Sequence, residues 1–225
     1  SPPMRYSILA IAALVASTTV HAQDADRSVK GGITVAGWKG RIDRRPLGQG
    51  KTINDSKFAT EGKDLRLSVG PAAFYYNPAN TASGDYTVKA TFKEHKMTAS
   101  HPHSYGIFIG GNDLESDTET LMYCIAYGNG TYSVKTFRGS AVQTLVNLEK
   151  TPALKQADAT GASTNEVGWS VKGGKPSCVI NGTTVKTFDK FDVVAGDKLK
   201  SLDGTYGIRV SHNVELTVSG FGMTK

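Results

Sequence analysis

The sequence has few of the residues that build metal clusters or span membranes. Only 2 cysteines occur among 225 residues, and they form no Cys-x-x-Cys pair, so cysteine alone cannot supply a zinc site or attach a haem. Apart from one short run near the start, no apolar stretch approaches the roughly 20 residues that a membrane-spanning helix needs. A Gly-x-Ser-x-Gly motif is also missing, which leaves a serine hydrolase without its usual sequence signature.

The one apolar run indicates export. It extends from Ile8 to Ala16, follows Met4 and the single charge of Arg5, and precedes small residues that end at Ala22. This order is typical of a secretory signal peptide cleaved after Ala22. We therefore expect an extracytoplasmic protein, periplasmic or secreted, without membrane attachment after cleavage. Its segments are upstream residues 1–3, a signal peptide at 4–22, an N-terminal linker at 23–32 and a single domain at 33–225.

The charge pattern argues against nucleic acid as a partner. Lys and Arg number 26 and Asp and Glu 20, for a formal net charge of +6. The cations are scattered singly instead of gathering in the stripe or tail that binds phosphates. In an oxidising compartment Cys124 and Cys178 can pair, which would stabilise the fold by roughly 3–4 kcal/mol through loop closure. Two separate buried thiols are the alternative, because the sequence does not show whether their strands are neighbours.

Short alternating segments predict an all-β domain. Residues 65–69 and 85–92 alternate apolar and polar side chains, as half-buried strands do. Asn181-Gly182 is a two-residue hairpin turn, and Gly128-Asn129-Gly130 separates another strand pair. Loops or turns are expected at 41–56, 77–83, 98–103 and 149–165, and a helical turn within 192–202. Further strands are expected near 33–38, 73–76, 105–109, 121–127, 131–138, 167–171, 178–180, 183–188, 204–210 and 214–218. About a dozen short strands favour a two-sheet sandwich or a barrel.

Several segments together resemble one superfamily. They are Trp169-Ser170-Val171, Val179-Ile180-Asn181-Gly182, the run from Asp203 to Val210, and Val218-Ser219-Gly220-Phe221. In order and spacing they resemble concanavalin A-like (laminin-G-like) jelly-roll domains, nearest the exported bacterial 3-keto-disaccharide hydrolase type. The resemblance implies a two-sheet antiparallel jelly-roll sandwich in a single domain, with ligands on a concave face in many members. Sugar binding and glycoside hydrolysis both occur on that fold, so the fold does not choose between them.

An acidic triplet is the candidate catalytic centre. Glu115, Asp117 and Glu119 match the ExDxE spacing of laminarinase-type enzymes, and on a strand they would share one face. They follow loop-forming residues, however, so a solvated acidic loop is the stronger expectation. A calcium loop formed by Asn112, Asp113 and Asp117 is a further alternative. No other cofactor is expected.

Histidines and an aromatic–arginine surface are the remaining candidates. His95, His101, His103 and His212 do not make a transition-metal site without a third ligand from elsewhere in the fold, so we expect loop histidines and no metal site. Sugar rings stack on aromatic faces while Arg binds hydroxyls, and Arg residues on strands must face solvent or a cleft. The predicted carbohydrate-binding residues are His103, Tyr105, Tyr132, Arg138, Arg209 and His212.

Three functions are consistent with the sequence. The favoured hypothesis is an exported carbohydrate-binding protein without a catalytic centre. A glycoside hydrolase acting on a glucan-like or oxidised disaccharide substrate is the first alternative, and it depends on Glu115, Asp117 and Glu119. A structural subunit of an extracellular assembly is the second. The sequence does not identify the ligand or the oligomeric state.

Overall fold

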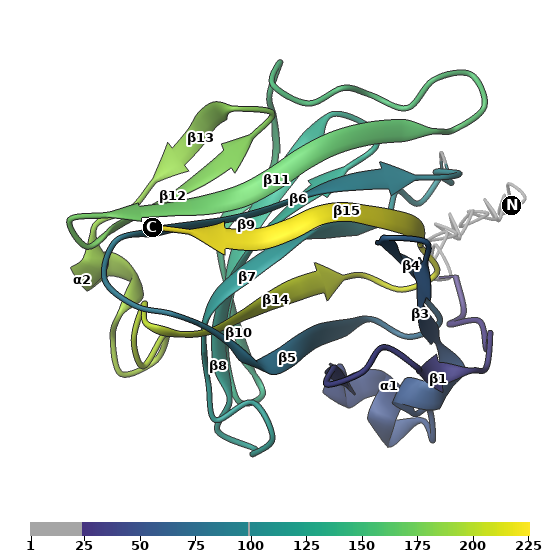
Figure 1. Cartoon of the computed structure of the whole chain (residues 1–225), viewed down its shortest axis with the longest axis horizontal. Coiled ribbons are helices and arrows are strands. Elements are labelled where there is room, and N and C mark those ends of the chain that lie inside the picture. Colours follow the sequence, from purple (N-terminus) through teal and green to yellow (C-terminus); the bar gives the residue numbers. More distant parts are fainter. Residues whose placement is uncertain (1–23, 99) are drawn as a thin grey trace, which may run out of the picture.

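Two β-sheets pack face to face and form the whole described body of the protein. The computed structural model describes residues 24–98 and 100–225, so the predicted signal peptide at 4–22 lies outside the described residues. Figure 1 shows the C-terminal strand β15 (Glu215–Thr224) lying beside β6 (Tyr86–Glu94), with the helices α1 (Arg44–Gly48) and α2 (Lys190–Val193) at opposite ends of the molecule. The expected all-β, two-sheet jelly-roll sandwich is confirmed.

The eight-stranded sheet has the order β1-β3-β4-β15-β6-β11-β12-β13, and the seven-stranded sheet has the order β10-β9-β8-β7-β14-β5-β2. All of these pairings are antiparallel except β1 with β3. The strands of the first sheet are Gly32–Ile33, Lys57–Glu61, Asp64–Ser68, Glu215–Thr224, Tyr86–Glu94, Ser163–Lys172, Lys175–Ile180 and Thr183–Thr187; those of the second are Ala141–Lys150, Thr131–Arg138, Thr120–Tyr127, Ser104–Asn112, Gly204–Val210, Ala73–Ala82 and Lys39–Ile42. The helices are α1 (Arg44–Gly48), the 3-10 turn η1 (Ile53–Asp55) and α2 (Lys190–Val193).

The main core fills the space between the sheets. Along β6, every second residue from Tyr86 to Phe92 is buried, as the alternation of a half-buried strand requires. Trp169 on β11 is fully buried, and its indole Nε1 donates a hydrogen bond of 3.0 Å to the carbonyl oxygen of Ile107 on β7. This bond satisfies the polar atom of the largest core side chain and links the two sheets.

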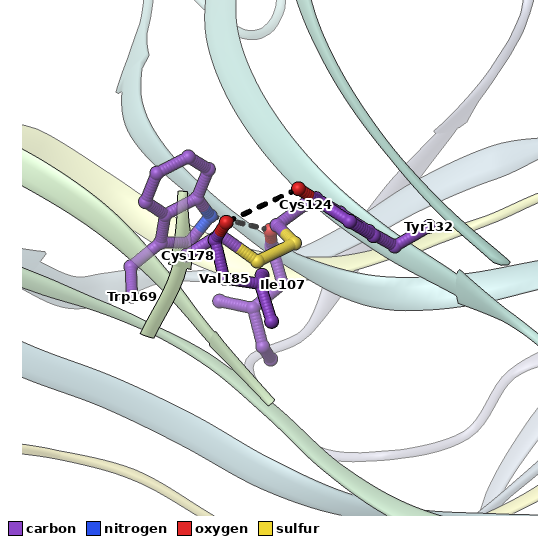
Figure 2. Close-up of a disulfide and its surroundings, with 6 residues drawn as sticks. All are labelled: Ile107, Cys124, Tyr132, Trp169, Cys178 and Val185. Carbon is purple, nitrogen blue, oxygen red and sulfur yellow. Dashed lines mark hydrogen bonds between the residues drawn. A yellow bond between two sulfur atoms is a disulfide. The ribbon is translucent and has the colours of Figure 1, made fainter. Parts of the chain in front are cut away.

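A disulfide also joins the sheets. Cys124 lies on β8 and Cys178 on β12, their Cα atoms are 6.0 Å apart, and they are bonded (Figure 2). The predicted pairing is therefore confirmed, and the alternative of two separate thiols is wrong. Nearby, the Tyr132 hydroxyl of β9 donates to the Val185 carbonyl of β13 at 3.2 Å (Figure 2). Both links cross the same end of the sandwich.

Several segments differ from the sequence-based expectation: strand β3 was missed, and residues 41–56, expected as a loop, include the end of β2, α1 and η1. The turn predicted at residues 77–83 is wrong, because β5 continues to Ala82, and Thr81 and Ala82 pair with β14. Beyond Tyr76 none of the described strands pairs with β5 on its other side, since β2 pairs only with residues 73–76. Pro78 therefore needs no ladder hydrogen bond there. Strand β10 was missed because it is a mostly exposed edge strand, which buries no alternating apolar face.

The described part of the predicted linker lies against the domain. Arg27 donates from Nε to the Val69 carbonyl at 2.7 Å and forms an ion pair of 2.6 Å with Glu215 of β15. Its backbone N–H donates to the Asn213 side chain at 2.9 Å. These bonds hold residues 24–28 beside the end of β14. None of the described helices is long and apolar enough to cross a membrane.

Removing the disulfide should lower the free energy of unfolding by about 3–4 kcal/mol, because it closes a loop of 54 residues. The double variant Cys124→Ala/Cys178→Ala and the reduced wild type should shift alike in urea unfolding. Equal midpoints for oxidised wild type and the double variant would contradict a stabilising role.

Glu94 at the end of β6 should make the protein less stable as the pH rises. The side chain is buried, Oε2 has no hydrogen-bond partner, and burial raises its pKa to about 7 from the ordinary 4.5. The folded state then holds this proton more tightly than the unfolded chain. Its stabilising effect is complete below pH 4.5 and is lost as the pH rises towards 7.

Urea unfolding at pH 4.5 and at pH 8 tests this assignment. Glu94→Gln should be more stable than wild type at pH 8, by up to about 3 kcal/mol for the full shift in pKa. At pH 4.5 the two proteins should differ little. A wild-type difference between the two pH values that Glu94→Gln leaves unchanged would contradict the assignment.

Candidate functional site

The outer face of the seven-stranded sheet carries a second apolar cluster. The cluster consists of Phe74, Tyr76, Phe108, Leu114, Leu121, Tyr123, Ile125 and Phe137, and all eight are buried. Strands β7 and β8 are therefore buried on both faces, which explains their nearly continuous apolar sequence. Because these aromatic rings are covered, they do not form an open stacking platform for sugar.

Arg209 of β14 covers part of this cluster. Its guanidinium carbon lies 5.1 Å from the Tyr123 ring centroid and 4.9 Å from that of Phe137. Asp43 accepts two bonds from it, at 2.5 Å from Nη1 and 2.7 Å from Nη2. Burial acts to lower the pKa of Arg209, but the Asp43 carboxylate outweighs it and holds the pKa above its ordinary value. This forked pair fixes the start of α1 on the sheet.

A cavity of about 830 Å³ opens beside this ion pair. We call it the histidine pocket. Its walls come from the N-terminal segment, α1 and the chain following it, the loop before β7, and the outward side chains of β8, β9 and β14. The lining residues are Asp24, Ala25, Asp26, Asp43, Arg45, Pro46, Gln49, Lys51, Ala72, Pro102, His103, Tyr127, Lys135, Arg209, Ser211 and His212.

Lys135 brings a cation to this pocket from β9. The side chain is half-buried and forms no ion pair with any carboxylate of the described residues. Burial lowers its pKa, and the neighbouring Arg209 lowers it further. Asp43, the nearby acid that opposes this shift, is already bonded to Arg209. A bound anion would therefore offset the cost of holding Lys135 in its charged form.

Two histidines and two aspartates lie close together in one wall of the histidine pocket. The His103 and His212 ring centroids are 4.6 Å apart. Asp24 reaches both rings, with 3.4 Å from Oδ2 to His103 Nε2 and 3.4 Å from Oδ1 to His212 Nε2. Burial lowers the pKa of His103, and His212 adds to this effect. The pKa of Asp24 is also lowered: burial opposes this, but the Asn213 hydrogen bond and the nearby imidazoles outweigh it.

Three of the six predicted carbohydrate-binding residues lie in the pocket: His103, Arg209 and His212. Tyr105 and Tyr132 instead lie in the core between the sheets, where they are 0% and 1% exposed. The alternation along β9 does place Tyr132 on one face with its i+2 and i+4 neighbours, but that face is the core face. Arg138 is exposed at the end of β9 and does not line the pocket.

The acidic triplet lies in the loop between β7 and β8, and each carboxylate has a cationic partner. Glu115 bonds to Lys39, which lowers its pKa. Asp117 is 3.0 Å from Arg41, and Glu119 is 3.2 Å from Arg44. A general acid needs a raised pKa and a free proton. The hydrogen bond and ion pair with Lys39 instead lower the pKa of Glu115.

The alternative calcium loop is not assembled in the described residues. Asn112 donates its amide to the Gly110 and Asp203 carbonyls, at 3.1 and 3.0 Å. Asp113 forms an ion pair with Lys200 at 3.0 Å, and Asp117 points to Arg41. The three side chains therefore make separate contacts and do not converge on one point.

Sequence reasoning missed Asp24, Asp26 and Lys135. The two aspartates fall in the segment assigned to a linker, directly after the predicted cleavage site. Lys135 is a polar residue on a strand whose side chains alternate between the two faces of the sheet. The sequence alone does not show which face points to the pocket. The pair Asp24-x-Asp26 could have indicated the site, because two carboxylates directly before a folded domain can pair with histidines of that domain.

Comparisons with solved structures agree with the fold. The carbohydrate binding module CBM66 from Bacillus subtilis superposes with a TM-score of 0.55 at 10% identity, covering 84% of this chain and 96% of that one. A Bacillus subtilis protein of unknown function with a galectin-like fold gives 0.57 at 13%, covering 86% and 96%. A family 7 alginate lyase in complex with product gives 0.53 at 14%, covering 89% and 99%. The chain thus shares a two-sheet jelly-roll fold with these proteins.

At this level of identity the likeness concerns the fold alone. No protein-family model and no curated protein sequence matches the chain.

Breaking the Asp43–Arg209 pair should destabilise the protein strongly. Asp43→Asn leaves a buried guanidinium without its counter-charge, and we expect a loss of about 3 kcal/mol in the free energy of unfolding. Asp43→Asn/Arg209→Met should lose less, because the buried charge is gone. Lys39→Gln, which breaks the exposed pair with Glu115, is the control and should cost under about 1 kcal/mol. Equal losses for Asp43→Asn and Lys39→Gln would show that the buried pair has no special role.

Proposed function

We propose that the protein is an exported carbohydrate-binding protein whose binding site is the histidine pocket, and that its ligand is an acidic sugar. The main support for this proposal is Lys135. This half-buried cation lies in the wall of a cavity of about 830 Å³, and it has no carboxylate partner among the described residues. The cavity volume falls in the range of small-molecule sites. It is large enough for one or two sugar rings.

The groups around Lys135 suit a carboxylated sugar. Lys135 would neutralise the carboxylate, while Gln49 offers an amide group for sugar hydroxyls. Tyr127 supplies an aromatic side chain at the end of β8. Sugars combine such polar contacts with ring stacking. A neutral sugar would leave Lys135 desolvated and unpaired, so charge provides the selectivity.

The export part of this proposal is supported by two features. The apolar run after Met4 has the pattern of a signal peptide, and the Cys124–Cys178 disulfide is typical of oxidising compartments. Binding without hydrolysis is favoured because Glu115, Asp117 and Glu119 each pair with a lysine or an arginine. Hydrolysis would require a carboxyl pair free to accept and donate a proton.

Calorimetric titration with oligosaccharides of hexuronic acid, and with neutral oligomers of equal length, tests the proposal. The wild type should bind the acidic series, and its affinity should fall as salt is added, because charge pairing is screened. Lys135→Gln should weaken binding at least tenfold, which corresponds to about 1.4 kcal/mol. Lys172→Gln, an exposed lysine on β11 of the other sheet, is the matched control and should bind like wild type.

Equal affinity for neutral and acidic oligomers would overturn the choice of ligand. If Lys135→Gln binds the acidic series as tightly as wild type, the binding site is not the histidine pocket. Release of shorter sugars from either series, lost in Glu119→Gln, would support the hydrolase alternative. If no sugar of either class binds, the proposal fails and the structural role becomes the better explanation.

A further inference from the structure

The wall of the histidine pocket formed by Asp24, His103 and His212 has the composition and spacing of a metal site. One ligand atom from each residue can be chosen so that all three lie within 4.8 Å of one another. These are two imidazole nitrogens and one carboxylate oxygen, the donor set of many transition-metal sites. The residues come from three separate places in the sequence, which the fold brings together.

The distances fit the size of a divalent ion. Asp24 oxygens lie 3.4 Å from His103 Nε2 and 3.4 Å from His212 Nε2. Two ligands about 2.1 Å from a zinc ion at a tetrahedral angle are separated by about 3.4 Å. The two contacts use different oxygens of the Asp24 carboxylate, so an ion between the rings would be bound by both oxygens, or by one oxygen after the carboxylate turns.

His103 provides an independent sign of a missing ligand. The residue is only 6% exposed, and its buried Nε2 makes no well-formed hydrogen bond, because the nearest carboxylate oxygen, Asp24 Oδ2, lies 3.4 Å away. Buried polar atoms in folded proteins nearly always have a partner, so an unsatisfied one requires an explanation. Its position beside Asp24 and His212 means that a bound cation would satisfy it directly.

His212 is held in the orientation that a metal ligand needs. Its Nδ1 lies 2.7 Å from Asp26 Oδ1, and because the carboxylate can only accept, Nδ1 donates its proton. In the neutral imidazole, the other nitrogen, Nε2, then presents its lone pair towards Asp24 and the pocket. A carboxylate behind a metal-bound histidine fixes the tautomer and ring orientation in the same way.

Asp24 is held in place by Asn213. The Asn213 amide nitrogen donates to Asp24 Oδ2 at 3.0 Å and to the Ala25 carbonyl at 2.9 Å, while its oxygen accepts from the Arg27 backbone. Asn213 adopts φ 58°, a left-handed conformation that asparagine tolerates better than most residues. This turn ties the N-terminal segment to the end of β14 and aims the Asp24 carboxylate at the histidines.

We propose that Asp24, His103 and His212 bind one divalent transition-metal ion, with zinc as the reference ion. Three protein ligands leave at least one coordination position open, and the three residues all line the pocket, so that position faces the cavity. The metal site does not depend on the identity of the sugar, because its ligands are distinct from Lys135. Zinc binding and sugar binding can therefore fail separately.

Titration of the untagged full-length chain with zinc chloride, followed by calorimetry, tests the site. We expect one equivalent to bind, and thermal unfolding to shift upward as zinc is added. Asp24→Asn and His212→Ala should each weaken binding at least hundredfold, because each removes a ligand. Asp26→Asn should weaken it ten- to hundredfold, since it only orients His212. Thiol binding cannot mimic this result, because both cysteines are in the disulfide.

His95→Asn is the matched control, because His95 bonds to Thr217 on the other sheet and should leave zinc affinity unchanged. If His103→Ala does not fold, Asp24→Asn, whose side chain is 34% exposed, still decides the question. Cobalt(II) titration followed by visible absorption supplies a second readout of nitrogen and oxygen ligation. Absence of stoichiometric zinc binding to wild type, or equal affinity in wild type, Asp24→Asn and His212→Ala, would overturn the proposal.

Discussion

The ion pair between Arg209 and Asp43 is the interaction on which the functional face depends. Arg209 lies on a strand whose other face packs in the main core, and its own face covers the aromatic rings of Tyr123 and Phe137. A guanidinium buried there requires a counter-charge. Asp43 supplies it, and although Asp43 is the N-cap residue of α1, its side chain makes no capping bond. The pair thus places α1 on the sheet and sets one wall of the histidine pocket.

The same constraint decides where polar chemistry can occur on the outer face. The apolar cluster under Arg209 and the loop from Asp113 to Glu119 fills one half of the sheet, and lysines and arginines pair with the acids of that loop. The other half stays open between α1 and the N-terminal segment. In this half, Lys135 lacks a carboxylate partner among the described residues, and His103 Nε2 lacks a well-formed hydrogen bond. The acidic sugar and the divalent cation proposed above would both interact with these groups.

Sequence patterns predicted the strands that bury one face against the other sheet. The alternation in β6, the Asn181-Gly182 turn with both residues at positive φ, and the strand β14 were all identified, because local periodicity and turn chemistry determine them. The edge strand β10 and the second half of β5 were not, since exposed edges carry no periodic apolar signal. Of the pocket residues, His103, Arg209 and His212 were identified as polar groups beside core strands.

By itself the sequence determined the all-β class, the order of the strands along the chain and the presence of two cysteines that could pair. These features depend on neighbours within a few residues. Only the tertiary structure decided that Cys124 and Cys178 lie across the core from each other and that Tyr132 faces inward while Lys135 faces the pocket. It also decided that Asp24 meets two histidines 79 and 188 residues further along the chain. Such contacts depend on how the two sheets pack, and no local pattern in the sequence encodes that distance.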